Sequence, residues 1–393
     1  MAPATAGVPA VRLSGYYFCY FAFIGVFMPY FALYLQQRGF PAAEIGLLMS
    51  VLQLMRLLAP NLWGWLADRL GRRTPVIRIA AVLSLLGFTA VPFVDGFWPV
   101  ALALAVMGFF WTAQHPLTEA LTFAHLRGQP ERYGPIRAWG SWGFIAASAG
   151  LGWWLERAGM DWVAWCGIGL LAAIVIAALW VPEAPVCPRA HAERSLWAVL
   201  RQREVKAFLL AAFFMSAAHG AFYVFFSIHL VEAGYSKTSV GLLWTLGVLA
   251  EIVVFTFAAP LLRRWSSRGI LLACFAIGIV RFLLMGWWVE SVLLMVLAQL
   301  MHAATFGAYH AAAVSTVHRW FGERNQAQGQ ALYGSLSFGG GGILGAVASG
   351  AAWESWGAGM TFSLGSFFAL AGLIAVWQGW PARLAVPEAG NKE

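Results

Sequence analysis

Charged residues are scarce in this sequence, since only 11% of its 393 residues are Asp, Glu, Lys or Arg, against 61% apolar residues. A soluble protein carries about 25% charged residues, so the composition excludes a soluble domain and indicates an integral membrane protein. Cysteine is rare as well. The four cysteines stand singly, without a C-x-x-C pair, and therefore predict neither a disulfide framework nor a zinc or redox centre.

The histidine patterns of metalloenzymes are also missing. No H-x-x-x-H or H-E-x-x-H occurs, so we expect no metal site, no intramembrane hydrolase or desaturase, and no enzyme activity. A cleaved targeting peptide is not expected either, because residues 1–12 are weakly charged and run directly into an apolar segment.

Long apolar runs recur along the whole chain. A helix that crosses a bilayer needs about 20 mostly apolar residues, and twelve stretches qualify. They lie at about 13–36, 42–66, 75–95, 97–124, 134–158, 160–182, 205–232, 238–262, 268–289, 291–317, 327–352 and 358–380. The sequence therefore predicts an all-α membrane protein with twelve transmembrane helices.

Lys and Arg are distributed unevenly between the two sides of this topology. With an even number of crossings both termini share a side, and twenty of the 25 basic residues fall on it. Cytoplasmic loops carry such an excess, so we expect cytoplasmic termini and a location in the cell inner membrane. The net charge of +8 is then an orientation signal, and nucleic acid is not an expected partner.

The longest polar interval separates two groups of six apolar segments. It predicts an N-terminal six-helix bundle at 1–182, a cytoplasmic linker at 183–204 and a C-terminal six-helix bundle at 205–393. An internal repeat supports this division, because residues 133–160 aligned on 333–360 without gaps share nine identities. Two related halves are typical of a large class of transporters.

A charged turn follows the second apolar segment and reads G-W-L-A-D-R-L-G-R-R from Gly64 to Arg73. It resembles the G-x-L-A-D-R-x-G-R-R signature of the major facilitator superfamily, at the place where that family has it. The resemblance implies the major facilitator fold and transport by alternating access. We expect a conformational latch in which Asp68 pairs with a guanidinium; the alternative is a solvated turn that only fixes orientation. The latch residues are Gly64, Asp68, Arg69, Gly71, Arg72 and Arg73.

Arg56, Glu119, Glu251 and Arg281 are charged residues that fall inside predicted spans. Each would cost about 2.5–3.5 kcal/mol if isolated at the bilayer centre, so we expect them to pair or to line a wet cavity. Glu119 and Arg137 lie at similar depths in successive helices, which predicts an ion pair between them. The alternative is that each ion pair only holds two helices together and has no role in transport.

Several stretches resemble the lactose permease branch of the superfamily. They include Gly25–Phe31, Arg137–Gly143 and the eighteen-residue step from Glu119 to Arg137. The resemblance implies that Glu119 and Arg137 bind substrate.

The second half carries the other part of this resemblance, which implies proton coupling by Glu251, Arg281 and His302. Thr305 stands where that branch has a carboxylate, and a hydroxyl cannot hold a proton reversibly near neutral pH. The proton would therefore be carried by Glu251 or by Glu119.

Three segments, Tyr133–Arg137, Gly241–Trp244 and His302–Gly307, resemble the phenylpropionate permease family, which carries aromatic acids with protons. The resemblance implies symport of a small organic acid, with aromatic acids favoured.

Aromatic residues recur at helical spacing along the first apolar segment, and Tyr20 and Phe27 are among them. Such a stripe is typical of helix packing, yet its rings and Trp139 could also stack on an aromatic substrate. If both glutamates pair with the nearest arginine, Arg56 is left for a substrate carboxylate. Whether Arg56 or Arg137 receives that carboxylate stays open.

These features together predict a monomeric secondary transporter in the lipid bilayer, driven by the proton gradient without a cofactor, for a small organic anion. A proton-driven exporter of drugs or metabolites, or a sugar or nucleoside symporter, fits the same buried charges and the same latch.

Overall fold

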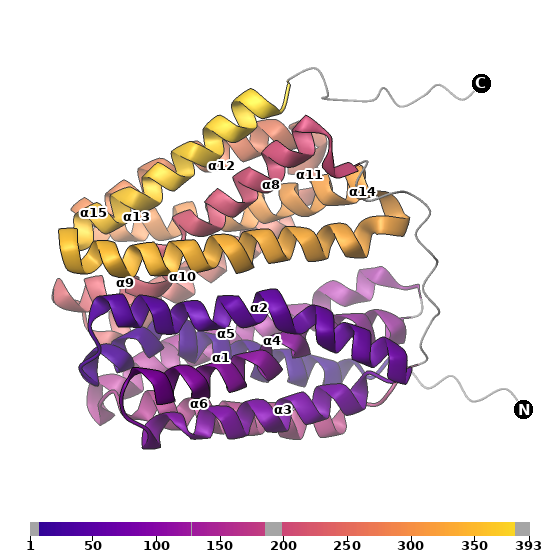
Figure 1. Cartoon of the computed structure of the whole chain (residues 1–393), viewed down its shortest axis with the longest axis horizontal. Helices are drawn as coiled ribbons and strands as arrows, with labels where there is room; N and C mark the ends of the chain where they lie inside the picture. The colour runs from indigo at the N-terminus through magenta and orange to yellow at the C-terminus, as the bar shows by residue number, and fades with distance from the viewer. Residues whose placement is uncertain (1–7, 127, 185–198, 382–393) are drawn as a thin grey trace, which may run out of the picture. The chain divides into compact units, whose positions relative to one another are not determined.

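The computed structural model describes residues 8–126, 128–184 and 199–381. Within these residues every regular element is a helix (Figure 1). The first six crossings are formed by α1 (Ala10–Gln37), α2 (Ala42–Leu70), α3 (Thr74–Thr89) with η1 (Val91–Phe93), α4 (Phe97–Leu126), α5 (Tyr133–Ala158), which η2 (Pro130–Arg132) precedes, and α6 (Trp162–Trp180). The later helices are α8 (Arg203–Ala218), α9 (Gly220–Glu232), α10 (Lys237–Thr256), α11 (Ala258–Arg264), α12 (Ser267–Trp287), α13 (Val292–His302), η3 (Ala303–Ala308), α14 (Tyr309–Gly334), η4 (Ser335–Gly341) and α15 (Gly342–Gly379).

Ten helical segments in the described part of the chain are long and apolar enough to cross a bilayer. The last of them, Gln328–Gly379, passes through a break at Gly357, where φ is 76°, and so holds two crossings. Glycine suits this break because a side chain disfavours positive φ. With α5, which has 26 residues, the number of crossings is the twelve predicted, and the all-α membrane architecture is confirmed.

Two compact units divide the chain. One contains Met1–Phe40, Leu54–Arg189 and Ser236–Thr245, and the other contains Pro41–Gln53, Ala190–Tyr235 and Leu246–Glu393. The first part of α2 thus packs with later helices, and the first part of α10 packs with earlier ones. Most of the linker predicted at 183–204 lies outside the described residues, because 185–198 are not among them.

Glycines set the packing of α1 on α5 in the first unit. A Cβ at Gly25 would lie 2.5 Å from the Phe144 carbonyl oxygen, and one at Gly143 would overlap the Phe18 carbonyl. Helices this close need glycine at the contact, as in many membrane interfaces. The second unit uses the same device, since a Cβ at Gly220 would overlap the backbone of Gly345.

Two π-helical segments, η3 and η4, interrupt the tenth and eleventh crossings. A π-helical turn shifts the register of the side chains after it and often marks a functional position. The segment η3 begins directly after His302. Nothing in the sequence pattern predicted either interruption.

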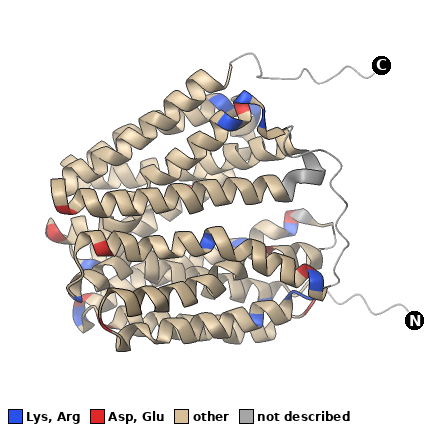
Figure 2. Cartoon of the chain, in the orientation of Figure 1, with Lys and Arg blue, Asp and Glu red and all other residues tan. Residues whose placement is uncertain are grey.

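Charged residues lie mostly near the helix ends (Figure 2). Some cap the start of a helix, where unpaired N–H groups favour a carboxylate. The Glu156 carboxylate accepts a hydrogen bond from Lys237 N at 2.7 Å, and the Glu354 carboxylate accepts one from Ala43 N at 3.3 Å. Helices α10 and α2 therefore begin against carboxylates of α5 and α15, respectively.

Candidate functional site

Glu119 on α4 is held by two neighbours in the first unit. Its Oε1 accepts a hydrogen bond from the Tyr133 hydroxyl at 2.6 Å, and its Oε2 lies 3.6 Å from His115 Nδ1. The carboxylate side chain keeps an exposed fraction of 35%. It can therefore still accept a hydrogen bond from a ligand.

Arg137 lies beside this group without pairing with it. Its guanidinium carbon is 3.8 Å from the centre of the Phe21 ring and 5.7 Å from that of Tyr17. No ion pair joins Arg137 to Glu119 among the described residues, so the predicted pair is wrong. The residues do lie at similar depths, but Tyr133, one turn earlier on α5, occupies the carboxylate, and the guanidinium stacks on an aromatic ring instead.

Tyr20 adds an aromatic wall near the carboxylate. Its ring stacks on that of Trp111, with centroids 4.7 Å apart and planes within 3°, and lies 5.5 Å from the His115 ring. Arg56 acts electrostatically on both Tyr20 and His115. The structure thus brings Tyr20, Arg56, Glu119 and Arg137 into one neighbourhood, which we call the N-terminal cluster.

Two other predicted binding residues lie apart from this cluster. Phe27 is 3% exposed and stacks on Phe31, with centroids 4.4 Å apart, beside Phe88 of α3. Its surroundings are those of a core residue. Trp139 is 52% exposed and contacts the Phe18 ring of α1.

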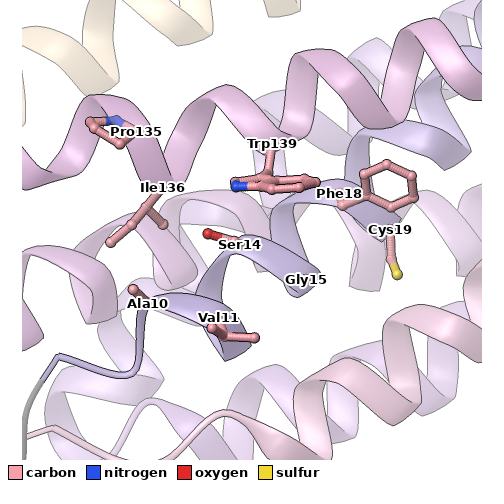
Figure 3. A pocket seen from close by; sticks show the side chains of 9 residues that line it. All are labelled: Ala10, Val11, Ser14, Gly15, Phe18, Cys19, Pro135, Ile136 and Trp139. Atoms are coloured by element: carbon pink, nitrogen blue, oxygen red, sulfur yellow. The ribbon is translucent and has the colours of Figure 1, made fainter.

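Trp139 lines a pocket of about 560 Å³ between the early parts of α1 and α5 (Figure 3). Val11, Phe18, Cys19 and Ile136 supply most of its apolar wall, and Ser14 its hydroxyl. Figure 3 shows the indole ring lying across the space between the two helices. Such a wall offers apolar contact but no charged group.

A second group of ionisable residues lies in the second unit, and we call it the C-terminal cluster. His302 Nε2 is 2.7 Å from Glu251 Oε1, and these side chains are 7% and 13% exposed. Arg281 is fully buried. It donates to the Ala298 carbonyl at 2.9 Å and to the Thr305 hydroxyl at 3.2 Å. Thr305 thus serves as a hydrogen-bond acceptor for Arg281.

His219 is a member of this cluster that the sequence analysis did not select. Its Nε2 lies 3.3 Å from Arg281 Nη1, and its Nδ1 is 2.8 Å from the Met215 carbonyl oxygen. Arg281 donates, so Nε2 accepts and Nδ1 carries the proton. The one sequence signal was a His-Gly pair in the middle of an apolar run, where α8 ends and α9 begins.

The charged segment Gly64–Arg73 was expected as a turn, but it continues α2 as far as Leu70 and turns only at Gly71–Arg73. Gly71 has φ of +64°, and its N–H donates to the Asp68 carbonyl at 3.2 Å. The Arg69 guanidinium lies 5.4 Å from the Trp65 ring centre. The Glu183 carboxylate accepts from Arg73 N and Thr74 N at 3.2 and 2.9 Å, which caps α3. Gly64 lies within α2 and Arg72 in the turn after it, and their latch role stays a prediction.

Among the described residues, no group of three or more His, Cys, Asp or Glu side chains is placed to hold a metal ion. Both clusters instead combine carboxylate, imidazole, guanidinium and aromatic groups. This arrangement can bind an organic ion and exchange a proton.

Comparison with known proteins places this arrangement in a family. The family described as "MFS_1 like family" matches residues 10–364. The chain belongs to the major facilitator superfamily. A relative from Escherichia coli, described as a probable 3-phenylpropionic acid transporter, is 31% identical over 82% of this chain and 86% of its own length. The maltose permease of Geobacillus stearothermophilus is 25% identical over 92% of each chain.

Among solved structures, a mutant of the nucleoside transporter NupG matches with a TM-score of 0.84 at 18% identity, covering 95% of this chain and all of that one. This likeness shows the fold alone. The major facilitator protein described here is thus a multi-pass membrane transporter of a small-molecule substrate, and its family and relatives are transporters rather than enzymes.

Proposed function

We propose that this major facilitator protein is a proton-coupled symporter of a small organic acid, with aromatic acids such as 3-phenylpropionate favoured. The buried contact between His302 and Glu251 beside Arg281 carries the proposal, because ionisable groups in a span are expensive and typical of proton pathways. The E. coli relative named for 3-phenylpropionic acid supports the substrate class.

Substrate binding is proposed for the N-terminal cluster. Tyr20 and Trp111 offer stacked rings against which an aromatic substrate can lie. The carboxylate of Glu119 and the guanidinium of Arg137 or Arg56 supply polar contacts. Phe27 and Trp139 were predicted for the same role. The position of Phe27 favours a packing role in α1, and that of Trp139 favours an apolar contact with the substrate.

Proton coupling is proposed for Glu251, Arg281 and His302, with His219 as an added member. The charge of Arg281 favours the ionised form of a nearby carboxylate, while burial favours the neutral form. A movement that changes the separation of these residues would therefore change proton affinity. Glu251 is the proposed proton carrier, and Glu119 is the alternative.

Alternating access is proposed to link the two reactions. Two six-helix bundles, at 1–182 and 205–393, would rock about the substrate. The segment Gly64–Arg73, which contains Asp68, would act as a breakable latch on the cytoplasmic side. The protein would work as a monomer in the inner membrane, with both termini cytoplasmic. The proton gradient would supply the energy for transport, and no cofactor would be needed.

Uptake by proteoliposomes tests this proposal. An imposed inward proton gradient should drive accumulation of radiolabelled 3-phenylpropionate above equilibrium, and a protonophore should abolish it. Protein-free liposomes correct for diffusion of the neutral acid. Expulsion of substrate under the same gradient would instead assign an exporter of drugs or metabolites.

The likeness to maltose permease favours a sugar symporter as a second candidate. Rings such as Tyr20 stack on sugars as well as on aromatic acids. Proton-driven uptake of maltose, with no uptake of 3-phenylpropionate, would establish this candidate over the first.

A further inference from the structure

Several polar atoms of the C-terminal cluster have no hydrogen-bond partner among the described residues. They are Arg281 Nη2, both side-chain polar atoms of Gln299, and His302 Nδ1. Arg281 and Gln299 are fully buried, and His302 is 6% exposed. Buried polar atoms are paired in the great majority of native proteins, so an unpaired group calls for a bound water, an ion or a ligand.

These atoms belong to adjoining side chains of one unit. Arg281 Nε donates to the carbonyl of Ala298, the residue before Gln299. A Cβ added at Gly247 would lie 3.1 Å from Gln299 Oε1 and 3.3 Å from His302 Cδ2, so the amide and the imidazole border the same spot.

Phe222 joins Arg281 to the same group. Its ring centre is 4.4 Å from the guanidinium carbon and 5.1 Å from the His302 ring. The side chains of Gln299 and His302 thus border Gly247, and those of Arg281 and His302 border Phe222.

The chemistry of the unpaired atoms favours an anion. The hydrogen bonds of Arg281 go to a carbonyl, a hydroxyl and an imidazole nitrogen, all of them neutral acceptors. Its remaining edge at Nη2 and the Gln299 amide offer N–H donors. A guanidinium edge and an amide together match a carboxylate, and such charge-assisted hydrogen bonds are the strong ones.

We propose that the carboxylate of the substrate binds Arg281 Nη2 and the Gln299 amide, next to His302 Nδ1. The inference rests on the proposed transport of an organic acid and deepens it. It places the carboxylate in the C-terminal cluster, so Arg281 replaces Arg56 and Arg137, the two residues between which the contact to the carboxylate was left open. Gln299 then becomes a binding residue that no sequence motif marks.

This position links the anion to the proton, which the hydrogen-bonded pair of His302 and Glu251 then holds together, rather than Glu251 alone. With Nε2–H donated to Glu251, a neutral His302 ring presents a lone pair at Nδ1, which repels a carboxylate. A doubly protonated ring presents a donor there and attracts it. The titratable and charged groups around His302 are Glu251, Arg281, His219 and, beside Arg281, Tyr223. Binding of the anion and protonation of His302 therefore favour one another.

Calorimetry on the purified full-length protein tests the proposal with 3-phenylpropionate and its uncharged analogue 3-phenylpropanamide. The wild-type chain should prefer the acid by about tenfold or more, as expected for a charge-assisted contact. Gln299→Leu should weaken acid binding by about tenfold and leave amide binding nearly unchanged. Gln299→Glu, which adds a negative charge, should abolish acid binding at neutral pH.

The matched control is Gln53→Leu, because Gln53 also has an unpaired side-chain oxygen in a span of the same unit. It should keep wild-type acid affinity. Thermal unfolding of each variant checks that the fold is retained, and repeating the titration in two buffers of different ionisation enthalpy counts protons. The wild-type protein should take up about one proton with each acid molecule that binds, and His302→Gln should show no such proton uptake.

Acid affinity that stays at the wild-type level in Gln299→Leu and Gln299→Glu overturns the proposal and leaves a buried water as the occupant. The proposed function stands in that case, because the acid still binds. If the wild-type chain binds no organic acid, the proposed function fails and the carboxylate site fails with it.

Discussion

His302 Nε2 lies 2.7 Å from Glu251 Oε1, and the two side chains are 7% and 13% exposed. A contact of this length between a carboxylate and an imidazole is a strong hydrogen bond when either group is ionised. It connects α10 to the residue at which the helical hydrogen-bond pattern of the tenth crossing changes to η3. A change of protonation here alters both the charge of the cluster and the contact between two helices.

The Glu251→Gln substitution keeps the shape of the side chain and removes its ability to hold a proton. We expect proton-driven accumulation of substrate to fall by about tenfold or more, whereas exchange of substrate across the membrane without a gradient continues. Uptake and counterflow in proteoliposomes measure the two activities. Glu290→Gln, which alters an exposed residue, is the control. Wild-type accumulation in Glu251→Gln would move the proton to Glu119.

Tyr133→Phe removes the hydroxyl that donates to Glu119 at 2.6 Å and keeps the ring that stacks on Phe123. A hydrogen bond to a charged group contributes about 1.5–3 kcal/mol, so we expect the KM for uptake to rise by about tenfold. Tyr235→Phe is the matched control, since that hydroxyl donates to a loop carbonyl at 2.8 Å. Lower thermal stability with an unchanged KM would make Glu119 a structural residue only.

Gly143→Ala adds a methyl group where α1 and α5 touch. The new Cβ would overlap the Phe18 carbonyl, so the helices must separate, and overpacking of this kind costs about 1–3 kcal/mol. Thermal unfolding of the purified protein should show a clear loss of stability. Gly150→Ala lies on the same helix with nothing within 4 Å of its Cβ, and it should leave stability unchanged. Equal behaviour of the two variants would contradict the close packing.

Asp68→Asn removes the charge of the proposed latch. We expect the transport rate to fall by about tenfold, the effect of losing one charge-assisted hydrogen bond, while substrate affinity stays the same. Initial rates in proteoliposomes and calorimetry in detergent separate the two quantities. The control is Glu131→Gln, another exposed carboxylate. A normal rate for Asp68→Asn would reduce the turn to an orientation signal.

The fold could be predicted because its signal is hydropathy. Each crossing is a run of about 20 apolar residues, and neither the broken crossing at His219 nor the kink at Gly357 hid those runs. The family signature at the end of α2 and the internal repeat then sufficed for the architecture.

The candidate site could be predicted only in part. The resemblance to the lactose permease branch grouped Glu251 with His302, and their side chains do lie in contact. Sequence spacing fixes the depth of a residue in the membrane. It does not fix the direction in which a long side chain turns, and for this reason Arg137 lies over Phe21 instead of pairing with Glu119. His219 and Gln299 were missed because their role depends on which atoms remain unpaired after folding.

The most direct test of coupled transport is a proton measurement. When 3-phenylpropionate is added outside lightly buffered proteoliposomes, symport removes protons from the medium, and its pH should rise in step with radiolabelled uptake. The wild-type protein should show this alkalinisation well above protein-free liposomes and above liposomes that contain Glu251→Gln protein. Uptake by the wild-type protein without any excess alkalinisation over those two controls would contradict proton symport.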